Sequence, residues 1–118
     1  MKPVELARAW MKCFESKDAA ALVALYAESA RHTSPKLRVL RPESGGSIEG
    51  RAALHAWWSD AFRRLPGLRY VERTITATDK RVVIEYWRFA QGDPDLPVAE
   101  VLELGDDGLI VASRVYHG

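Results

Sequence analysis

The chain has 118 residues, of which 47% are hydrophobic and 28% are charged, as expected for one globular domain with one core. Its 17 basic and 16 acidic residues leave a net charge of +1 and form no block of one sign, which argues against a nucleic-acid or membrane-surface partner. No apolar run approaches the roughly 18 residues of a membrane span. Glu5 and Arg8 interrupt the apolar N-terminus, so we expect no signal peptide and a cytoplasmic location.

Three helices are expected ahead of the main run of strands. In residues 4–16, apolar side chains recur at the spacing of an amphipathic helix. Residues 19–28 predict a second, short helix, and Asp18 is a good N-cap because its carboxylate accepts from N–H groups of the first turn. Gly50 opens a third helix over residues 51–64, which is broadly apolar on one face.

The segment between the second and third helices changes its periodicity. His32 and Ser34 share one side of a short strand with period two, and Pro35 stops or bends that strand. Residues 36–47 contain proline and a glycine pair and are interpreted as a loop, with a brief extended piece at 37–40. Such a loop is as consistent with a cover over a pocket as with a plain surface segment.

The rest of the chain predicts four strands. They occupy residues 68–77, 81–90, 97–104 and 109–117, with short turns between them. A meander of this kind predicts an antiparallel sheet, and helices followed by such a sheet indicate one α+β domain over residues 1–118. Helices can cover only one face of the sheet, yet the strand at 81–90 is apolar on both. We therefore expect the uncovered face to form a homodimer.

Cys13 is the only cysteine, which excludes an internal disulfide and a metal site built from several cysteines. It falls on the apolar face of the first helix, which favours a buried, unreactive thiol over a nucleophile. Neither metal-ligand spacing nor a phosphate-binding glycine loop appears elsewhere, so we expect no metal and no cofactor.

Three segments carry a family resemblance: DAAALVALYAESARHTSP at 18–35, EGRAALHAWW at 49–58 and DGLIVASRVYHG at 107–118. Together with the order of elements, they resemble the nuclear transport factor 2-like superfamily, in its SnoaL-like and ketosteroid-isomerase-like branch. The resemblance implies a cystatin-like cone, in which three N-terminal helices pack on a curved antiparallel sheet and enclose a pocket. It also implies a dimer through the sheet. The superfamily includes isomerases, cyclases, hydratases, epoxide hydrolases and proteins without chemistry, so the resemblance is informative mainly about fold.

The functional residues of the steroid isomerases carry over only in part. Their first-helix tyrosine, an oxyanion donor, falls on Trp10, whose indole N–H can donate a hydrogen bond but cannot release a proton. Their general-base aspartate falls on Ser34, which is not a base at neutral pH. Their protonated acid falls on Glu100, and a carboxyl in an apolar pocket can stay neutral and donate. The comparison argues against the same reaction by the same groups.

His32 and Glu100 are the candidate catalytic residues. The ordinary pKa of histidine lies near neutral pH, as a general base or acid requires, and Ser34 beside His32 would help to hold a substrate oxygen. The alternative for His32 is a structural histidine that is hydrogen-bonded to a neighbour at a strand end. Glu100 interrupts the apolar strand VAEVLEL, which indicates either a functional carboxyl or an ordinary cross-strand pair with Arg114.

The remaining candidates would bind a ligand. The resemblance points Glu85 and Trp87 inward with Val83 and Phe89, although a salt bridge at a dimer face accounts for Glu85 equally well. It also points His117 inward, near a chain end that is prone to fray. Most of the large aromatic side chains belong in the core, but several should face the pocket and suit a flat apolar ligand. The candidate ligand-binding residues are Trp10, Tyr26, Ser34, Trp57, Trp58, Glu85, Trp87 and His117.

The sequence therefore predicts a pocket for a small apolar polycyclic or polyketide-like carbonyl compound. The expected chemistry is acid/base catalysis of the isomerase, cyclase or dehydratase type, without a cofactor. The alternatives are a non-catalytic ligand-binding module and a dimeric protein-interaction domain. His32 and Glu100 near a common point in a cavity would favour the enzyme. A cavity of aromatic groups alone would favour binding, and a cavity filled by its own side chains would favour an interaction domain.

Overall fold

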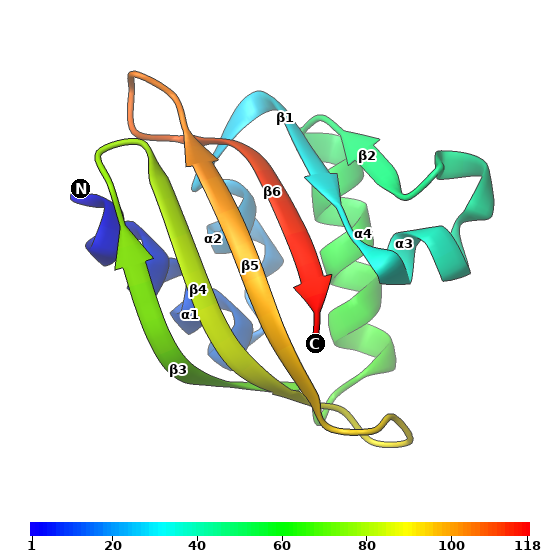
Figure 1. Ribbon diagram of the computed structural model, residues 1–118. Coiled ribbons are helices and arrows are strands. Elements are labelled where there is room, and N and C mark those ends of the chain that lie inside the picture. Colours follow the sequence, from blue (N-terminus) through cyan, green and yellow to red (C-terminus); the bar gives the residue numbers. More distant parts are fainter.

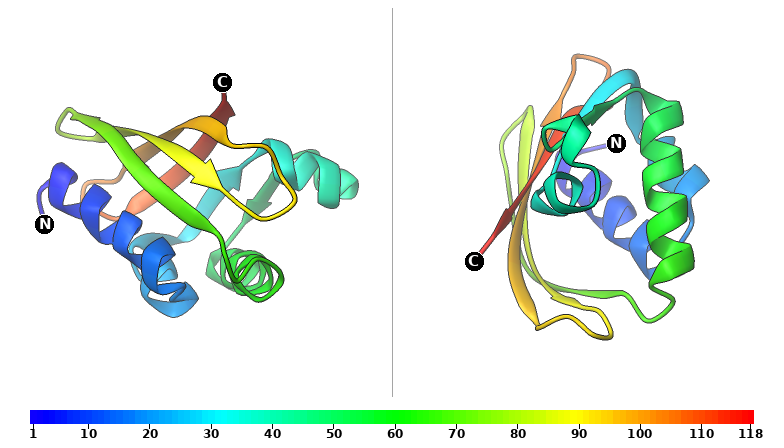
Figure 2. Two further views of the ribbon diagram at one scale, coloured as in Figure 1. Left: turned by 90° about the horizontal axis from the view of Figure 1, so that it is seen from below. Right: turned by 90° about the vertical axis from the view of Figure 1, so that its right-hand side faces the viewer.

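The computed structural model describes the whole chain, Met1–Gly118. The elements are, in chain order, α1 (Pro3–Ser16), α2 (Ala19–Val23), β1 (Tyr26–Thr33), α3 (Pro35–Leu40), the 3₁₀ turn η1 (Pro42–Ser44), β2 (Ser47–Glu49), α4 (Arg51–Arg64), β3 (Arg69–Ala77), β4 (Arg81–Phe89), β5 (Leu96–Leu104) and β6 (Ile110–His117). The strands form one curved, unclosed sheet in the order β2-β1-β6-β5-β4-β3. The helices lie on its inner face (Figures 1 and 2). The predicted α+β architecture is confirmed.

The sheet is not antiparallel throughout. Strands β3 to β6 form the predicted antiparallel meander, but β1 runs parallel to β6 and places His32 beside Ser113. The all-antiparallel expectation is therefore wrong at β1. The reason is topological, because β1 is followed by the α3–α4 connection instead of a hairpin, and it joins the sheet beside the last strand of the chain. Strand β2 pairs antiparallel with β1 and forms the sheet edge.

The predicted helix over residues 19–28 is wrong beyond Val23. Helix α2 has only five residues, and β1 already begins at Tyr26. Arg51 donates to the Tyr26 backbone oxygen from Nε and Nη2, at 2.9 and 2.7 Å. In a helix over residues 19–28 this carbonyl would lie in the last turn without an intrahelical partner, whereas in the structure the two bonds from Arg51 satisfy it. The predicted cap is present, since the Asp18 carboxylate accepts from the N–H of Ala21 at 2.9 Å.

The expected loop over residues 36–47 instead contains α3, η1 and β2, so the chain has a fourth α-helix. Pro35 does not bend a strand but occupies the first position of α3, where its missing N–H would have no helical partner. The Ser34 hydroxyl accepts from the N–H of Lys36 at 3.1 Å and caps this helix. Ser34 thus ends β1 and starts α3 at the same point.

The core lies between the inner face of the sheet and helices α1 and α4. On α1 the buried stripe includes Trp10 and Phe14, with Cys13 also buried as predicted. Phe14 stacks on Tyr70 of β3, with ring centroids 4.5 Å apart, and Tyr70 stacks on Tyr86 of β4 at 4.2 Å. This row of aromatic rings joins α1 to strands β3 and β4, at one end of the sheet. No helix is long and apolar enough to cross a membrane.

The predicted inward direction of alternate side chains on β4 is wrong. Tyr86 and Arg88 face the core, whereas Glu85 and Trp87, together with Val83 and Phe89, point to the outer face, where they are half-buried. The strand is apolar at both parities, so the pattern gave no local signal for its direction. No helix covers the outer face of strands β3 to β6, as the right-hand view of Figure 2 shows.

Candidate functional site

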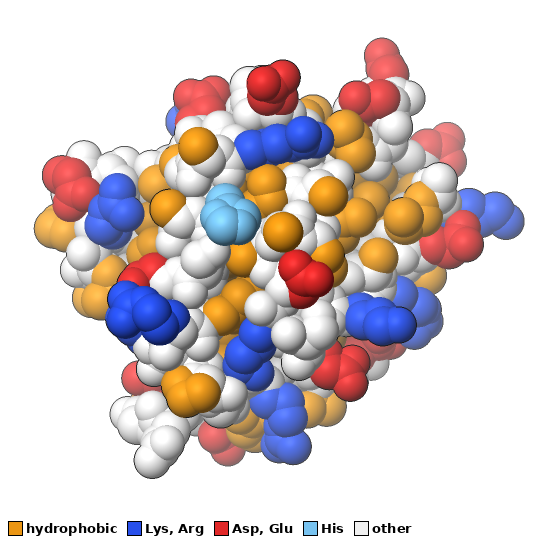
Figure 3. Space-filling view, turned by 180° about the vertical axis from the view of Figure 1, so that it is seen from behind, with side chains coloured by type: hydrophobic (Ala, Val, Ile, Leu, Met, Phe, Trp, Pro, Cys, Tyr) orange, Lys and Arg blue, Asp and Glu red, His pale blue; other side chains and the backbone are white.

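A cavity of about 360 Å³ lies between the inner face of the sheet and α4, with α3 at its rim. Its aromatic walls are formed by Trp10, Phe14, Trp57, Trp58, Tyr70 and Tyr86. Its polar lining includes His32, Ser34 and Glu100 deep in the fold, and Lys36, Arg88, Asp93 and His117 from α3, from the ends of β4 and β6 and from the connection between β4 and β5. The volume lies near the lower end of the roughly 300–1,000 Å³ that is usual for ligand pockets. The outer surface on the helical side of the molecule carries intermixed positive and negative side chains, with no area of one sign (Figure 3).

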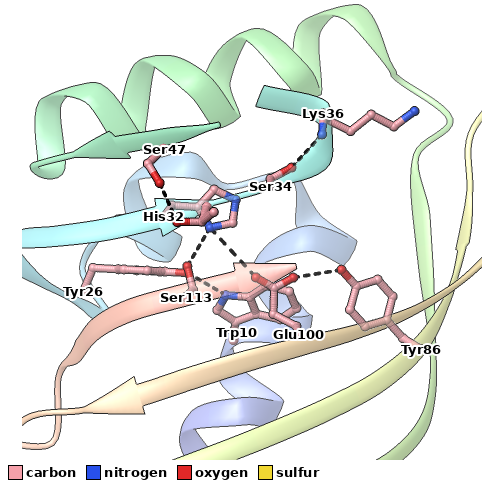
Figure 4. Close-up of polar contacts among 10 residues, drawn as sticks. Trp10, Tyr26, His32, Ser34, Lys36, Ser47, Tyr86, Glu100 and Ser113 are labelled. Atoms are coloured by element: carbon pink, nitrogen blue, oxygen red, sulfur yellow. Dashed lines mark hydrogen bonds and ion pairs between the residues drawn. The ribbon is translucent and has the colours of Figure 1, made fainter. Parts of the chain in front are cut away.

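A chain of buried hydrogen bonds leads from α1 to His32 (Figure 4). The Trp10 indole N–H donates to the Tyr26 hydroxyl at 3.1 Å, and Tyr26 donates to Ser113 Oγ at 3.0 Å. Ser113 Oγ lies 2.6 Å from His32 Nδ1. We assign the Ser113 proton to Nδ1, because the donors then run in one direction from Trp10 and each hydroxyl of the chain both accepts and donates. This order makes Nδ1 an acceptor and places the imidazole proton on Nε2.

The His32 side chain is 4% exposed, and its ring lies 5.0 Å from the Trp58 ring, centroid to centroid. Burial lowers the pKa of His32 to about 3, so the imidazole is neutral near pH 7. Figure 4 shows Nε2 on the side of the ring away from Ser113. His32 therefore presents an N–H donor to the cavity instead of a basic nitrogen.

Glu100 lies beside His32 on the floor of the cavity. Its Oε1 accepts from the Tyr86 hydroxyl at 3.1 Å, while Oε2 is buried without a hydrogen-bond partner, 3.9 Å from His32 Nδ1. Burial raises the pKa of Glu100 to about 8, against the opposing effect of the Tyr86 hydrogen bond. The carboxyl is therefore mostly protonated at neutral pH. A neutral acid beside a neutral imidazole avoids placing two charges in the core.

The cross-strand alternative for Glu100 is wrong. Arg114 points to the outer face and pairs with Glu103, Nη1 to Oε2 at 2.7 Å. The same carboxylate also accepts from Arg81 at 2.9 Å. Glu103 thus occupies the half-buried, ion-paired position on the outer face of β5. Glu100, three residues earlier and on the other face, lacks a basic partner apart from the nearby imidazole.

The structure brings together most, but not all, of the predicted site residues. His32, Glu100, Trp10, Ser34, Trp57, Trp58 and His117 line the cavity. Tyr26 is fully buried behind it, as a link in the hydrogen-bond chain. Glu85 and Trp87 do not reach the cavity, because they lie on the outer face, where Arg73 packs over the Trp87 ring at 5.5 Å.

Sequence reasoning missed the contributions of Tyr86 and Arg88, which both follow from the reversed direction of β4. It also gave no role to Ser113, which links Tyr26 to His32. A charged residue within the apolar run RVVIEYWRFA was the available signal for Arg88. No group of three or more His, Cys, Asp or Glu side chains is placed to hold a metal ion.

The chain belongs to the family of SnoaL-like domains, whose sequence model matches residues 7–113. This family is part of the nuclear transport factor 2-like superfamily, so the predicted relationship is confirmed. No curated protein shows a significant sequence match.

Solved structures show the same fold. A SnoaL-like protein of unknown function from Burkholderia thailandensis is 24% identical, with a TM-score of 0.88 over 98% of this chain and 92% of that one. A cystatin-fold protein from Novosphingobium aromaticivorans is 17% identical, with a TM-score of 0.81 over 98% of both chains. A protein with a cystatin-like fold from Methylobium petroleophilum is 23% identical, with a TM-score of 0.80 over 98% of this chain and 74% of that one.

Proposed function

We propose that this protein is an enzyme that catalyses proton transfer on a small apolar carbonyl compound, without a cofactor. The observation that carries the proposal is the pairing of a neutral buried imidazole with a carboxyl whose Oε2 has no hydrogen-bond partner. Both side chains line one cavity with aromatic walls. A buried polar atom left unpaired is costly and rare, and it is found where a ligand or a reaction makes use of it.

In this proposal Glu100 is the general acid and His32 is a second hydrogen-bond donor. A substrate oxygen bound between them receives hydrogen bonds from His32 Nε2–H and from the Glu100 carboxyl. Donors held in a low-dielectric site stabilise negative charge on that oxygen as it develops. Oε2 is out of contact with solvent and has no hydrogen-bond partner in this structure, so the Glu100 side chain must turn toward the cavity to donate to a ligand. Catalytic hydrogen bonds commonly form or tighten only in the complex with substrate.

The proton of Glu100 then passes to the substrate oxygen, an α-carbon proton passes to a water molecule at the cavity mouth, and solvent returns a proton to the Glu100 carboxylate to complete the cycle. Isomerisation, aldol-type cyclisation and dehydration all pass through such an enol. A pKa of about 8 suits this role, since the acid form predominates at neutral pH and its conjugate base is still readily formed. The Tyr86 hydroxyl remains as the donor that stabilises the carboxylate after transfer.

The test is exchange of the α-protons of 2-tetralone with solvent deuterium, followed by NMR, in the wild type and in Glu100→Gln. The amide keeps the size of the side chain and a donor but cannot transfer a proton. We expect the exchange rate to fall about 10²- to 10⁴-fold. Glu103→Gln on the outer face is the matched control and should exchange at the wild-type rate. Equal rates in wild type and Glu100→Gln would exclude Glu100 as the acid.

A non-catalytic binding module is the second candidate. It is favoured by the fact that the Ser113 hydroxyl already occupies His32 Nδ1, which leaves no free imidazole lone pair to act as a base. Saturable binding of 2-tetralone to the wild type, measured by quenching of the cavity tryptophans and without any deuterium exchange, would support this reading over the enzyme.

We also propose that the protein forms a homodimer through the outer face of the sheet. This face carries the half-buried Val83, Trp87 and Val101, and the more exposed Val71, Val111 and Tyr116. Exposed apolar area without a covering layer is typical of an interface. Light scattering coupled to size exclusion should give twice the mass of the chain, and Val101→Arg should shift the protein to monomer. A monomeric wild type would contradict this part of the proposal.

A further inference from the structure

The mouth of the cavity holds a buried arginine, Arg88, that has a single carboxylate partner. The Arg88 side chain is 8% exposed, and its one carboxylate partner is Asp93, Nη1 to Oδ2 at 3.0 Å. An arginine carries five N–H donors, and burying its charge is costly unless these donors are used. One ion pair to one oxygen therefore leaves most of the Arg88 guanidinium without a charged acceptor.

Asp93 does not neutralise the cluster, because two cations share it. Lys36 Nζ lies 3.4 Å from the same Oδ2 that Arg88 contacts. His117 faces this group from β6, and its pKa is lowered by burial and by the charges of Lys36 and Arg88, which keeps it neutral. Arg64 also lines the cavity, but its Nε pairs with Asp60 at 2.7 Å. Two positive charges against one negative charge leave an excess of one positive charge at this end of the cavity.

The cationic cluster, formed by Arg88 and Lys36 around Asp93, and the pair His32–Glu100 lie at different levels of the same cavity. Glu100 is opposite Ile84 in the register of β5 and β4, and Arg88 is four residues further along β4. Four residues of extended strand span about 13 Å between Cα atoms. Arg88 and Glu100 both line the cavity, together with its aromatic walls. This spacing suits a body of one or two fused rings.

We propose that the substrate of this site is an apolar ring compound with a carboxylate group, which Arg88 and Lys36 bind while the ring body occupies the aromatic cavity. This inference rests on the proposed function and names the substrate class of that site. The planar guanidinium forms paired N–H···O bonds to a carboxylate, and a site from which water is excluded strengthens such charge-assisted bonds. The carboxylate also supplies the negative charge that the cluster lacks.

The experiment compares the binding of a charged ligand with that of its uncharged isostere, by isothermal titration calorimetry at neutral pH. The probes are 2-naphthoate and 2-naphthamide, which share the ring system and differ in the charge of the polar group. We expect the wild type to bind the acid at least tenfold more tightly than the amide. Arg88→Met should weaken binding of the acid by about tenfold to hundredfold, and leave that of the amide within about twofold.

Three control variants allow the result to be interpreted even if Arg88→Met is poorly folded. Arg88→Lys retains the charge and should keep a preference for the acid, reduced by loss of the paired geometry. Lys36→Met removes a half-exposed cation and should weaken acid binding about threefold or more. Arg114→Met removes an arginine that is ion-paired on the outer face, and should change nothing.

Equal binding of acid and amide by the wild type would overturn the carboxylate inference and leave the proposed proton-transfer function standing. Failure of the acid to bind at all would overturn it as well. A clear acid preference that depends on Arg88, in a protein that shows no deuterium exchange with 2-tetralone, would instead support the carboxylate site and count against catalysis. The two proposals therefore fail in different ways.

Discussion

Replacing Glu100 with glutamine should change the pH dependence of stability. The pKa of Glu100 is about 8 in the folded protein, against an ordinary value of 4.5 in an unfolded chain. Because the folded pKa is the higher one, the folded state holds a proton that the unfolded state releases. The contribution of this group to stability is fully present below about pH 4.5 and is lost as the pH rises toward about 8. Glutamine has no proton to lose and removes this loss.

The size of the effect follows from the pKa difference. At about 1.4 kcal/mol per pH unit, the full difference corresponds to about 5 kcal/mol, of which about 3.5 kcal/mol develops between pH 5 and pH 8. The wild type should therefore lose about that much free energy of unfolding relative to Glu100→Gln across this interval. Burial sets this magnitude, because desolvation is the main cause of the raised pKa.

The assay is urea unfolding followed by tryptophan fluorescence, at several pH values from about 5 to 8, with linear extrapolation to water. Glu103→Gln is the matched control. The pKa of Glu103 is lowered by hydrogen bonds from Arg114 and Arg81, so its contribution is already complete in this interval and should add no slope. A difference between wild type and Glu100→Gln that stays constant from pH 5 to 8 would refute the assignment of a raised pKa to Glu100.

Two further substitutions test the local structure around the site. Ser113→Ala removes both the acceptor of the Tyr26 hydroxyl and the donor to His32 Nδ1, and should lower the free energy of unfolding in urea by about 2 to 4 kcal/mol. The control Ser29→Ala, at an exposed position, should lower it by less than about 0.5 kcal/mol. Equal effects of the two substitutions would contradict the buried chain of hydrogen bonds. Ser34→Ala removes the cap of α3 and should lower stability by about 1 kcal/mol with faster amide exchange in α3, and unchanged exchange would show that the cap is dispensable.

The sequence predicted the elements with strong local signals and missed those that depend on distant partners. The amphipathic stripe of α1 and the alternation in β5 lie within one element, so they could be recognised without the fold. Helix α3 was missed because Pro35 reads equally as a breaker or as a first helical residue, and the capping bond of Ser34 decides between them. The start of β1 was missed because its carbonyl partner, Arg51, comes from a different element.

The reversed direction of β4 had the larger consequence for the site. With apolar side chains on both faces, its burial is decided by which face α1 covers, and that is a tertiary contact. The reversal moved Glu85 and Trp87 out of the cavity and brought Tyr86 and Arg88 into it. The hydrogen bond to Glu100 and the cationic mouth both depend on these two residues.

The sequence by itself determined the α+β class, the family resemblance and which residues of β1 and of β5 share one side of their own strand, since alternation along a strand is a property of the local backbone. It did not determine that His32 and Glu100 both face the cavity, because that depends on how the strands pack. Only the tertiary structure decided their chemistry. The parallel pairing of β1 with β6 joins His32 to Ser113, 81 positions away, and sets the tautomer of the imidazole. Exclusion of water by surrounding elements sets both pKa values, because desolvation depends on everything packed around a group and not on its neighbours in the chain.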